Sequence, residues 1–373
     1  MEPVKVALVG IGGMGGSHFR NIIENEMYQL VGVCDIGLHR KDVQERRKIA
    51  KDKGIPFFRD YKAMYRKVDC EAVFVAAPHH WHARMTIDAL KKGCHVFTEK
   101  PPAGSTADVM KMIAAQKKAG KLVAVGFNPS ASPAVQAVKR HIANGDLGTI
   151  KQVTLAILWW RENSYYRRAK WVGRMKIDGV DCSDGCMCNQ GSHGIFQALY
   201  LASEKKHPSL SAPSDIEANL YRFHTASQFE AEDMACVRAT LDGKKGKKLL
   251  AYITTDIKDK EDFCDIIGTK GRIRVGEPHI ILNDGSKITV KQEEGVPSKQ
   301  QNFALAIRGE AELYCPLEEG AKQVLLTDGA YASLKRKVKV APWGALEDGC
   351  AALMRAVEQR CLISELKDKP DWA

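Results

Sequence analysis

The first third of the chain alternates between short apolar runs and longer segments whose apolar residues have helical spacing. The runs at 4–9, 30–34, 72–77, 95–98 and 122–125 predict strands, and the segments at 17–24, 38–53, 83–92 and 106–119 predict helices. Strands that are apolar along their whole length need cover on both faces, as in a parallel sheet with intervening helices. We therefore expect a doubly wound α/β domain over 1–128.

The pattern changes after Phe127. One helix is expected at 133–143, followed by strand-like runs at 149–160, 216–223, 234–241, 248–256, 263–267, 272–275, 280–282 and 287–290. Turn pairs such as Asp242-Gly243 and Asp284-Gly285 join neighbouring runs, which is typical of antiparallel strands. The pattern predicts an α+β domain with a mostly antiparallel open sheet over 129–345, for substrate binding and oligomerisation, and a C-terminal helical extension over 346–373.

One predicted strand is apolar on both faces. In the run VTLAILWW at 153–160, successive side chains point to opposite sides and nearly all of them are apolar. Helices of the same chain can cover one face. We expect a second subunit to cover the other, because soluble monomers rarely expose large apolar patches. The strand therefore predicts a homo-oligomer, whether a dimer, a tetramer or a larger assembly.

Composition is that of an ordinary globular protein. Of the 373 residues, 45% are hydrophobic and 27% are charged. The most apolar run, 153–160, is far shorter than the ~20 residues that a membrane helix needs, so we expect no membrane partner. The start MEPVKVALVG lacks the layout of a signal peptide, which predicts a cytoplasmic protein.

The chain is basic, with 56 Lys and Arg against 45 Asp and Glu, a net charge of +11. The basic residues are spread over its whole length, and their runs are not interleaved with aromatic residues as a stacking surface would be. We therefore expect no nucleic-acid partner. The charge suits an anionic small molecule such as a dinucleotide.

The first predicted strand runs into the glycine-rich turn GIGGMG. Gly10, Gly12 and Gly15 fit the pattern G-x-G-x-x-G, with Gly13 and Met14 between them. The first glycine permits a tight turn, the second lets the backbone approach a pyrophosphate, and the third lets helix and strand pack closely. Phosphates would then sit at the helix N-terminus. A merely structural glycine turn is the alternative, but the preceding strand and following helix favour a dinucleotide site.

An acidic residue follows at the spacing that such a site requires. Asp35 stands 20 residues after Gly15, at the end of the second predicted strand, where a carboxylate binds the adenosine ribose hydroxyls. It favours NAD, because it repels the 2′-phosphate of NADP. Arg40 and Lys41 lie close behind and keep NADP open. We therefore expect a Rossmann domain that binds NAD, with Arg40 among the cofactor contacts.

Longer motifs carry a resemblance to a known family. They are VFVAAPHHWHARMTIDALKKG at 73–93, CHVFTEKP at 94–101, GFN at 126–128, DGCMCNQGSHGIF at 184–196, IIGTKGRIRV at 266–275 and LEEGAKQVLLTDGAYASLKRKVKV at 317–340. Together with the glycine turn, these stretches resemble the Gfo/Idh/MocA oxidoreductases. The resemblance covers nearly the whole chain.

The resemblance assigns roles to individual residues. It implies that Lys100, in the Glu-Lys-Pro motif, and His193 are catalytic, and it brings Asn189 into the catalytic set. Asn189 stands where the family pattern has an aspartate four residues before the histidine. Further residues match the loop along the nicotinamide ribose or other cofactor contacts, namely Ala77, Pro78, His79, His82, Glu99, Lys100 and Asn128.

Lys100 and His193 are both candidates for the general base. A lysine with an ordinary pKa of ~10.4 is protonated at neutral pH, whereas a histidine starts near ~6.5. Asn189 lacks the negative charge that would favour an imidazolium. We therefore expect His193 to take the proton and Lys100 to stabilise the developing charge on the alcohol oxygen.

An aromatic stretch precedes the loop that carries His193. Its members suit either the core or the C–H faces of a sugar: Trp159, Trp160, Tyr165, Tyr166 and Trp171. The candidate substrate contacts are Arg161, Asn163, Tyr165, Tyr166 and Trp171.

Two clusters raise the question of a metal. Cys182, Cys186 and Cys188 lie near His193, but the second cysteine pair of a zinc site is lacking. The histidines at 79, 80 and 82 lie on a strand-to-helix turn and point in different directions. We expect no metal, and we expect the cysteines to be mostly buried thiols.

The resemblance implies an NAD-dependent dehydrogenase that oxidises a secondary hydroxyl of a sugar, a glycoside (at ring position 3) or a cyclitol such as inositol. Two alternatives stay open. One is an NAD-dependent glycosidase that works by transient oxidation, and the other is a non-enzymatic regulator that senses a sugar or NAD. The presence of both Lys100 and His193 argues against the regulator.

Overall fold

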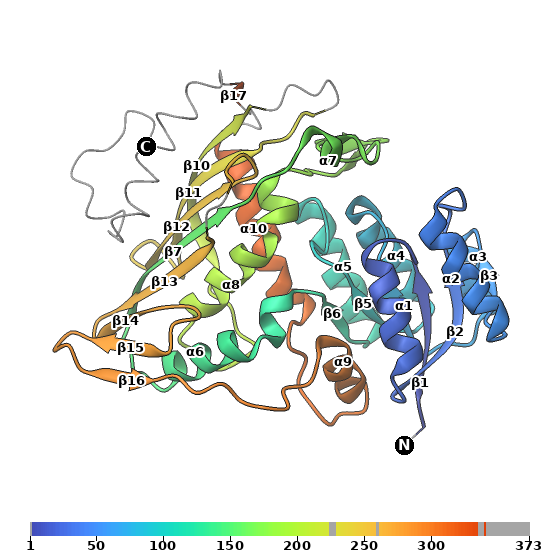
Figure 1. Ribbon diagram of the computed structural model, residues 1–373, viewed down its shortest axis with the longest axis horizontal. Helices are drawn as coiled ribbons and strands as arrows, with labels where there is room; N and C mark the ends of the chain where they lie inside the picture. Colours follow the sequence, from blue (N-terminus) through green and yellow to red (C-terminus); the bar gives the residue numbers. More distant parts are fainter. Residues whose placement is uncertain (1, 224–228, 259–260, 335–338, 341–373) are drawn as a thin grey trace. The chain divides into compact units, whose positions relative to one another are not determined.

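The computed structural model describes residues 2–223, 229–258, 261–334 and 339–340 (Figure 1). The chain divides into two units, Met1–Gln136 with Glu293–Val324, and Ala137–Gln292 with Leu325–Ala373. The sequence pattern predicts a boundary at 128 and places 293–324 in the second domain. The structure instead joins that segment to the first unit. The helical extension expected at 346–373 lies outside the described residues.

A six-stranded parallel sheet forms the centre of the first unit, in the order β3-β2-β1-β4-β5-β6. Its strands are β1 (Val4–Val9), β2 (Tyr28–Cys34), β3 (Phe57–Phe58), β4 (Ala72–Val75), β5 (His95–Thr98) and β6 (Val123–Val125). The helices are α1 (Met14–Glu24), α2 (Lys41–Asp52), α3 (Tyr61–Lys67), α4 (His82–Lys91) and α5 (Thr106–Ala119). The doubly wound Rossmann fold is thereby confirmed. Strand order reverses between β1 and β4, where such sheets bind ligands at the carboxyl ends of their strands.

Helix α9 (Lys299–Ile307) belongs to the core of this first unit. Its Phe303 ring packs against Phe74 and Phe97, with 5.7 Å between ring centroids in each pair. Ser298 and Gln301 form a capping box that fixes where the helix begins. These contacts explain why a segment so far along the chain joins the N-terminal sheet.

A nine-stranded sheet dominates the second unit, in the order β16-β15-β14-β13-β7-β12-β11-β10-β17. Its strands are β7 (Ile150–Leu158), β10 (Pro213–Arg222), β11 (Met234–Leu241), β12 (Lys247–Thr254), β13 (Phe263–Gly268), β14 (Gly271–Arg274), β15 (His279–Leu282), β16 (Lys287–Thr289) and β17 (Lys339–Val340). A short hairpin pairs β8 (Lys176–Ile177) with β9 (Val180–Asp181). Only the β7–β12 and β10–β17 pairs of the large sheet are parallel among the described strands, so the mostly antiparallel sheet is confirmed.

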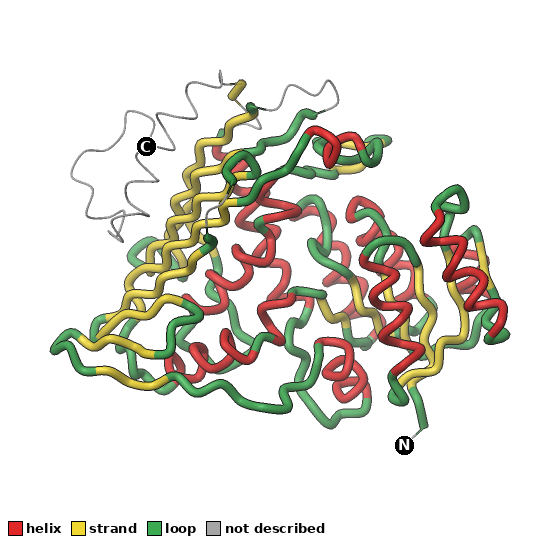
Figure 2. The backbone as a smooth tube through the Cα atoms, viewed as in Figure 1, coloured by secondary structure: helices red, strands yellow, loops and turns green. Residues whose placement is uncertain are grey.

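Both faces of β7 are apolar, as the sequence pattern predicts. Helix α8 (Ser192–Ala202) packs on one face, where a side chain at Gly194 would come within 2.7 Å of Ile157. Ala156 and Leu158 lie on the other face, in a cluster with Tyr252 and Phe263 among others. In Figure 2 the strands form one layer with helices along one side of it. The second unit also contains α7 (Asn163–Arg167) and parts of α6 (Pro133–Ala143) and α10 (Leu317–Ser333).

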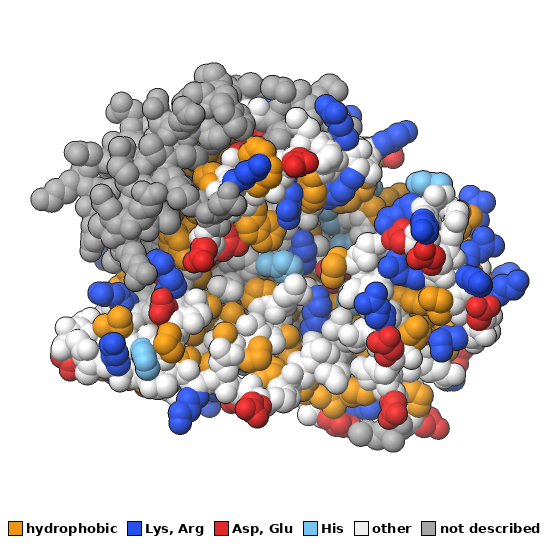
Figure 3. All heavy atoms as spheres, viewed as in Figure 1, with side chains coloured by type: hydrophobic (Ala, Val, Ile, Leu, Met, Phe, Trp, Pro, Cys, Tyr) orange, Lys and Arg blue, Asp and Glu red, His pale blue; other side chains and the backbone are white. Residues whose placement is uncertain are grey.

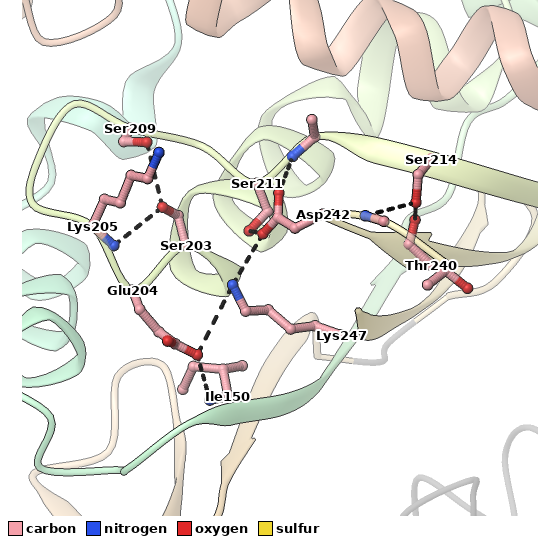
Figure 4. A network of polar contacts seen from close by, with 12 residues as sticks. Ile150, Ser203, Glu204, Lys205, Ser209, Ser211, Ser214, Thr240, Asp242 and Lys247 are labelled. Atoms are coloured by element: carbon pink, nitrogen blue, oxygen red, sulfur yellow. Dashed lines mark hydrogen bonds and ion pairs between the residues drawn. The ribbon is translucent and has the colours of Figure 1, made fainter. Parts of the chain in front are cut away.

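A polar network fixes the segment that follows α8 (Figure 4). Asp242 accepts hydrogen bonds from the Ser211 hydroxyl at 2.7 Å and the Ala212 amide at 2.9 Å, and its carboxylate lies 3.0 Å from Nζ of Lys247. Glu204 accepts from the Ile150 amide at 2.8 Å. These contacts attach the segment after α8 to the sheet, which fixes the direction of the helix whose first turn contains His193.

In the described part of the chain, no helix is long and apolar enough to cross a membrane. On the face drawn in Figure 3, Lys and Arg side chains are scattered among Asp and Glu side chains.

Candidate functional site

The glycine loop between β1 and α1 forms an open cradle. Gly10 has a φ of +83°, and a side chain there would come within 2.5 Å of the Ala76 carbonyl oxygen in the loop after β4. A side chain at Gly15 would lie 2.0 Å from the Gly10 carbonyl oxygen, so α1 packs directly on β1. A side chain at Gly13, by contrast, would have open space around it, with no neighbouring atom within 4 Å. The cradle therefore fits a pyrophosphate at the start of α1.

Asp35 is fixed beside this loop. Its Oδ2 accepts the Ile11 amide at 2.8 Å and its Oδ1 accepts the Gly37 amide at 2.7 Å. Two apolar side chains are exposed at the same edge, Met14 (53%) and Ile36 (78%). A carboxylate held beside exposed apolar surface suits the hydroxyls and the ring of an adenosine. The residues expected to bind NAD at this edge therefore meet in the structure.

The loops after β4 and β5 are joined by His82. The imidazole is buried, with Nδ1 2.8 Å from the Pro101 carbonyl oxygen and Nε2 2.7 Å from the Ala77 carbonyl oxygen. Burial lowers the pKa of His82 to about 4, although the hydrogen bonds with the Pro101 and Ala77 carbonyl oxygens oppose this shift. Just before His82 in the chain, His79 is buried and Pro78 is exposed. His82 therefore acts as a brace between the loops.

Glu99 is the centre of a buried polar network at the end of β5. Its Oε1 lies 2.8 Å from Nε2 of His18 and 3.3 Å from Nζ of Lys299, and its Oε2 accepts the Lys100 amide at 3.2 Å. Burial opposes ionisation of Glu99, but the Lys299 ammonium and the His18 hydrogen bond offset it and lower the pKa of the carboxyl. The network fixes the backbone of the Glu-Lys-Pro motif.

Lys299 is a site residue that the sequence analysis missed. Besides Glu99, its ammonium contacts the Gly126 carbonyl oxygen and Oδ1 of Asn128, both at 2.9 Å. It thus connects two of the predicted cofactor contacts, Glu99 and Asn128. The capping box at 298–301 signals a helix start, but no pattern in the sequence signals a contact between positions 200 residues apart.

His193 lies in the first turn of α8 and is half-buried. A π-helical turn, Cys186–Gln190, precedes it, closed by a hydrogen bond of 2.6 Å from the Gly191 amide to the Cys186 carbonyl. Such turns are frequent at functional sites. From this turn, the side-chain Nδ2 of Asn189 donates to Oδ1 of Asp184 at 2.8 Å, and Oδ2 of Asp184 accepts the backbone amide of Gly173 at 2.8 Å. Asp184 is a second residue that the sequence analysis missed.

A buried acid supports the same π-helical turn. Oε1 of Glu232 accepts the Met187 amide at 3.0 Å, and the Tyr331 hydroxyl donates to Oε2. A side chain at Gly185 would lie 2.0 Å from this carboxylate. Burial raises the pKa of Glu232 to about 7. No motif signals this role, because Glu232 lies in a different segment from the turn that it holds.

The aromatic stretch divides between core and surface. Tyr166 is buried, its hydroxyl is 2.6 Å from Oγ1 of Thr255, and its ring packs on Phe229 at 4.6 Å. We therefore correct its assignment from substrate contact to core residue, because its polar group and its ring are both engaged inside the unit.

The other candidate substrate contacts lie nearer the surface. Asn163 is exposed, and Tyr165 and Trp171 are half-buried. The Arg161 guanidinium lies 5.0 Å from the ring centroid of Tyr165, and Arg161 also lines a groove with Trp159, Trp160 and Lys258. Its buried Nε has no hydrogen-bond partner among the described residues. A buried donor of this kind suits a hydroxyl-bearing ligand.

The cysteines described in the second unit are buried thiols, and none of these described residues forms a disulfide. The Cys186 thiol donates to the Ile253 carbonyl at 3.4 Å, and burial raises its pKa well above the usual value. Over the described ranges, no group of three or more His, Cys, Asp or Glu side chains is arranged to hold a metal ion.

Comparison with known proteins agrees with this geometry. A model described as an oxidoreductase family with an NAD-binding Rossmann fold matches residues 4–127, and the GFO/IDH/MocA C-terminal domain matches residues 135–274. An inositol 2-dehydrogenase of Rubrobacter xylanophilus is 26% identical over 90% of this chain and 92% of its own. A D-glucoside 3-dehydrogenase of Escherichia coli is 31% identical over 42% of this chain and 44% of its own.

Solved structures share the fold. The WlbA dehydrogenase of Bordetella pertussis, solved with NADH and UDP-GlcNAcA, aligns with a TM-score of 0.73 at 24% identity, over 89% of this chain and 97% of its own. The two family models together span most of the chain, and the glycine cradle and Asp35 lie inside the first. This chain therefore belongs to the Gfo/Idh/MocA oxidoreductase family and carries that family's NAD-binding Rossmann domain.

Proposed function

We propose that the protein is an NAD-dependent dehydrogenase that oxidises a secondary hydroxyl of a sugar, a glycoside or a cyclitol. The observation that carries the proposal is the position of Lys100. It follows β5 at the carboxyl edge of the sheet, where the glycine cradle and Asp35 also lie, on a turn held by Glu99. A cationic side chain there suits an alcohol oxygen that becomes negative during reaction.

The chain's own residues would divide the work of the reaction. NAD, when bound, supplies the hydride acceptor. His193 would remove the hydroxyl proton as general base, from the first turn of a helix that the π-helical turn and Asp184 orient. Lys100 would donate a hydrogen bond to the alcohol oxygen as its charge develops. Ala77, Pro78, His79 and Asn128 would border the nicotinamide side of the dinucleotide, with His82 as their brace.

The substrate class follows from the relatives and from the second unit. The relatives named above act on inositol and on a glucoside. In this chain, the half-buried rings of Tyr165 and Trp171 lie against the guanidinium group of Arg168, and that of Arg161 also lies beside Tyr165. Asn163, in the same segment, is exposed and offers a hydrogen-bonding amide. That mixture suits a polyhydroxylated ring, such as inositol or a glycoside oxidised at position 3.

A substrate screen tests the proposal. The purified protein is incubated with NAD and inositols, free sugars or glycosides, while NADH is followed by absorbance and the products by mass spectrometry. NADH formation with a keto product two hydrogens lighter is expected. Cleavage of a glycoside without net NADH would replace the proposal with an NAD-dependent glycosidase. Tight sugar or NAD binding without conversion of any compound would replace it with a sensing role.

We also propose a homo-oligomer built on the outer face of the large sheet. On that side Ala156 and Leu158 are buried beneath Tyr252 and Phe263, whose rings are only partly buried. A second copy is the occupant that the sequence pattern predicts for this apolar surface. Light scattering is expected to give at least twice the mass of one chain. A monomer at micromolar concentration would contradict this arrangement.

The cytoplasmic location of the protein stays a prediction.

A further inference from the structure

Two carboxylates and two guanidinium groups lie around the glycine cradle, from Asp35, Asp42, Arg40 and Arg46. Arg40 stretches from the neighbourhood of Asp35 to the cradle itself. A side chain at Gly37 would lie 3.0 Å from Oδ1 of Asp35 and 3.2 Å from Cδ of Arg40, and one at Gly12 would lie 2.7 Å from Nη1 of Arg40. An arginine in this place is the group that receives the 2′-phosphate of NADP in related folds.

Arg40 is nevertheless not available as a free cation. Its Nε donates to Oδ1 of Asp42 at 3.0 Å and its Nη2 to Oδ2 of Asp42 at 2.9 Å, a two-pronged pair. The same carboxylate receives Nη1 of Arg46 at 3.0 Å and the Gly13 amide at 3.2 Å. One carboxylate in the first turn of α2 therefore holds both guanidinium groups near the cradle.

The two arginines differ in what else holds them. Arg46 also donates to the Ile11 carbonyl at 2.9 Å and to the Asp42 carbonyl at 3.2 Å, and a side chain at Gly16 would run into its guanidinium. The two hydrogen bonds described for the Arg40 guanidinium both go to Asp42, and its side chain is 47% exposed. Loss of the Asp42 charge would thus free Arg40 and leave Arg46 in place.

We propose that Asp42 is a determinant of dinucleotide specificity, which excludes NADP by neutralising Arg40 beside the ribose site formed by Asp35. Asp35, Asp42, Arg40 and Arg46 together carry two negative and two positive charges, so the carboxylates balance the two guanidinium groups. The Gly13 and arginine contacts lower the pKa of the Asp42 carboxyl against the opposing effect of burial, so Asp42 is charged at neutral pH.

Removal of this charge is expected to change specificity more than stability. The Arg40–Asp42 pair is partly exposed, with side-chain exposures of 47% and 34%, and such pairs contribute little to folding. In Asp42→Asn the side chain keeps its shape and an oxygen for the Gly13 amide. Dinucleotide preference is separate from the sugar or cyclitol substrate proposed above, so failure of one leaves the other standing.

Equilibrium binding tests the role of Asp42 without turnover. Calorimetry gives the Kd of NADH and of NADPH for wild type, Asp42→Asn, Asp42→Asn with Arg40→Ala, and Glu45→Gln. Glu45 is exposed on the same helix, so its variant makes the same change of net charge away from Arg40. The Kd ratio of NADPH to NADH is expected to fall by about tenfold in Asp42→Asn, to return toward the wild-type value when Arg40 is also removed, and to stay unchanged in Glu45→Gln.

Three results would overturn the role of Asp42. They are an unchanged ratio in Asp42→Asn, a gain in NADPH binding that survives Arg40→Ala, and an equal gain in Glu45→Gln. Thermal melting checks that each variant is folded. If Asp42→Asn does not fold, Asp42→Ser, which keeps an oxygen at the start of α2, takes its place with the same expected ratio.

Discussion

Nδ2 of Asn189 donates a hydrogen bond of 2.8 Å to Oδ1 of Asp184, inside the turn that leads to His193. The Gfo/Idh/MocA pattern has an aspartate at the position of Asn189. In this chain the side-chain amide of Asn189 pairs with the carboxylate of Asp184 instead. The backbone amide of Gly173 holds that carboxylate in place with a hydrogen bond of 2.8 Å. The neutral residue at 189 thus has a structural reason, because Asp184 already supplies the negative charge nearby.

Asn189→Asp would place a second carboxylate at hydrogen-bonding distance from Asp184. Two carboxylates so close cannot both ionise easily, so one of them should hold its proton to a higher pH. The variant is expected to be close to wild type in stability at pH 5 and less stable by roughly 1–3 kcal/mol at pH 8. Thermal or urea unfolding at the two pH values measures the difference. Asn144→Asp, at an exposed position, is the control. Equal stability at pH 8 would show that the turn adapts to the second charge.

His193→Ala is expected to reduce turnover by ~10²–10⁴, the usual effect of a positioned general base, with NAD affinity nearly unchanged. Lys100→Met is expected to be at least as damaging, because an unpaired charge would then develop on the alcohol oxygen. Steady-state kinetics and NADH binding measure both effects. His141→Ala and Lys92→Met remove the same side-chain types elsewhere and should retain activity. Near-normal turnover in His193→Ala with an inactive Lys100→Met would assign the base role to Lys100.

Lys299→Met is expected to lower the free energy of unfolding by roughly 3 kcal/mol at pH 7, because Glu99 would stay buried without its ammonium partner. The folded-state pKa of Glu99 is lowered, so its ion pair stabilises the protein above the ordinary carboxyl pKa and this contribution is lost on acidification. The difference from wild type should therefore shrink toward pH 3.

Urea unfolding across this pH range measures the effect of Lys299→Met. Lys117→Met, at an exposed position of α5 in the same unit, should stay near wild type. A Lys299→Met protein as stable as wild type at neutral pH would mean that His18 alone suffices to hold the charge of Glu99.

Glu232→Gln tests the buried acid beneath the π-helical turn. Burial raises the folded-state pKa of Glu232 to about 7 from the ordinary value of 4.5, so its protonated form fits the fold better than its charged form. The stability that Glu232 contributes is full below about pH 4.5, declines as the pH rises, and is gone above about pH 7. Wild type is expected to lose roughly 3 kcal/mol relative to Glu232→Gln over this interval.

Unfolding curves between pH 4 and pH 8 measure this difference, with Glu217→Gln as the exposed control, which should follow wild type. A constant difference between wild type and Glu232→Gln at every pH would show that the carboxyl does not titrate in this interval.

The sequence by itself determined the two sheets and the cofactor edge. The mostly apolar runs that begin at 4, 72 and 95 predict buried parallel strands, because each is too short for a helix and is followed by a helical segment. Gly10, Gly15 and Asp35 are fixed by local geometry, because a tight turn and a strand end place them at one sheet edge whatever lies elsewhere. Local patterns therefore sufficed for the fold class and the dinucleotide site.

Tertiary structure decided the residues that hold these local elements in place. Lys299 reaches Glu99 and Asn128 only because α9 returns to the first unit, and Glu232 reaches the π-helical turn from another segment. Tyr166 is a core residue rather than a substrate contact because Phe229 and Thr255 surround it. Periodicity and motifs report neighbours within a few residues along the chain. Charge pairing and packing depend on distance in space, which only the folded chain defines.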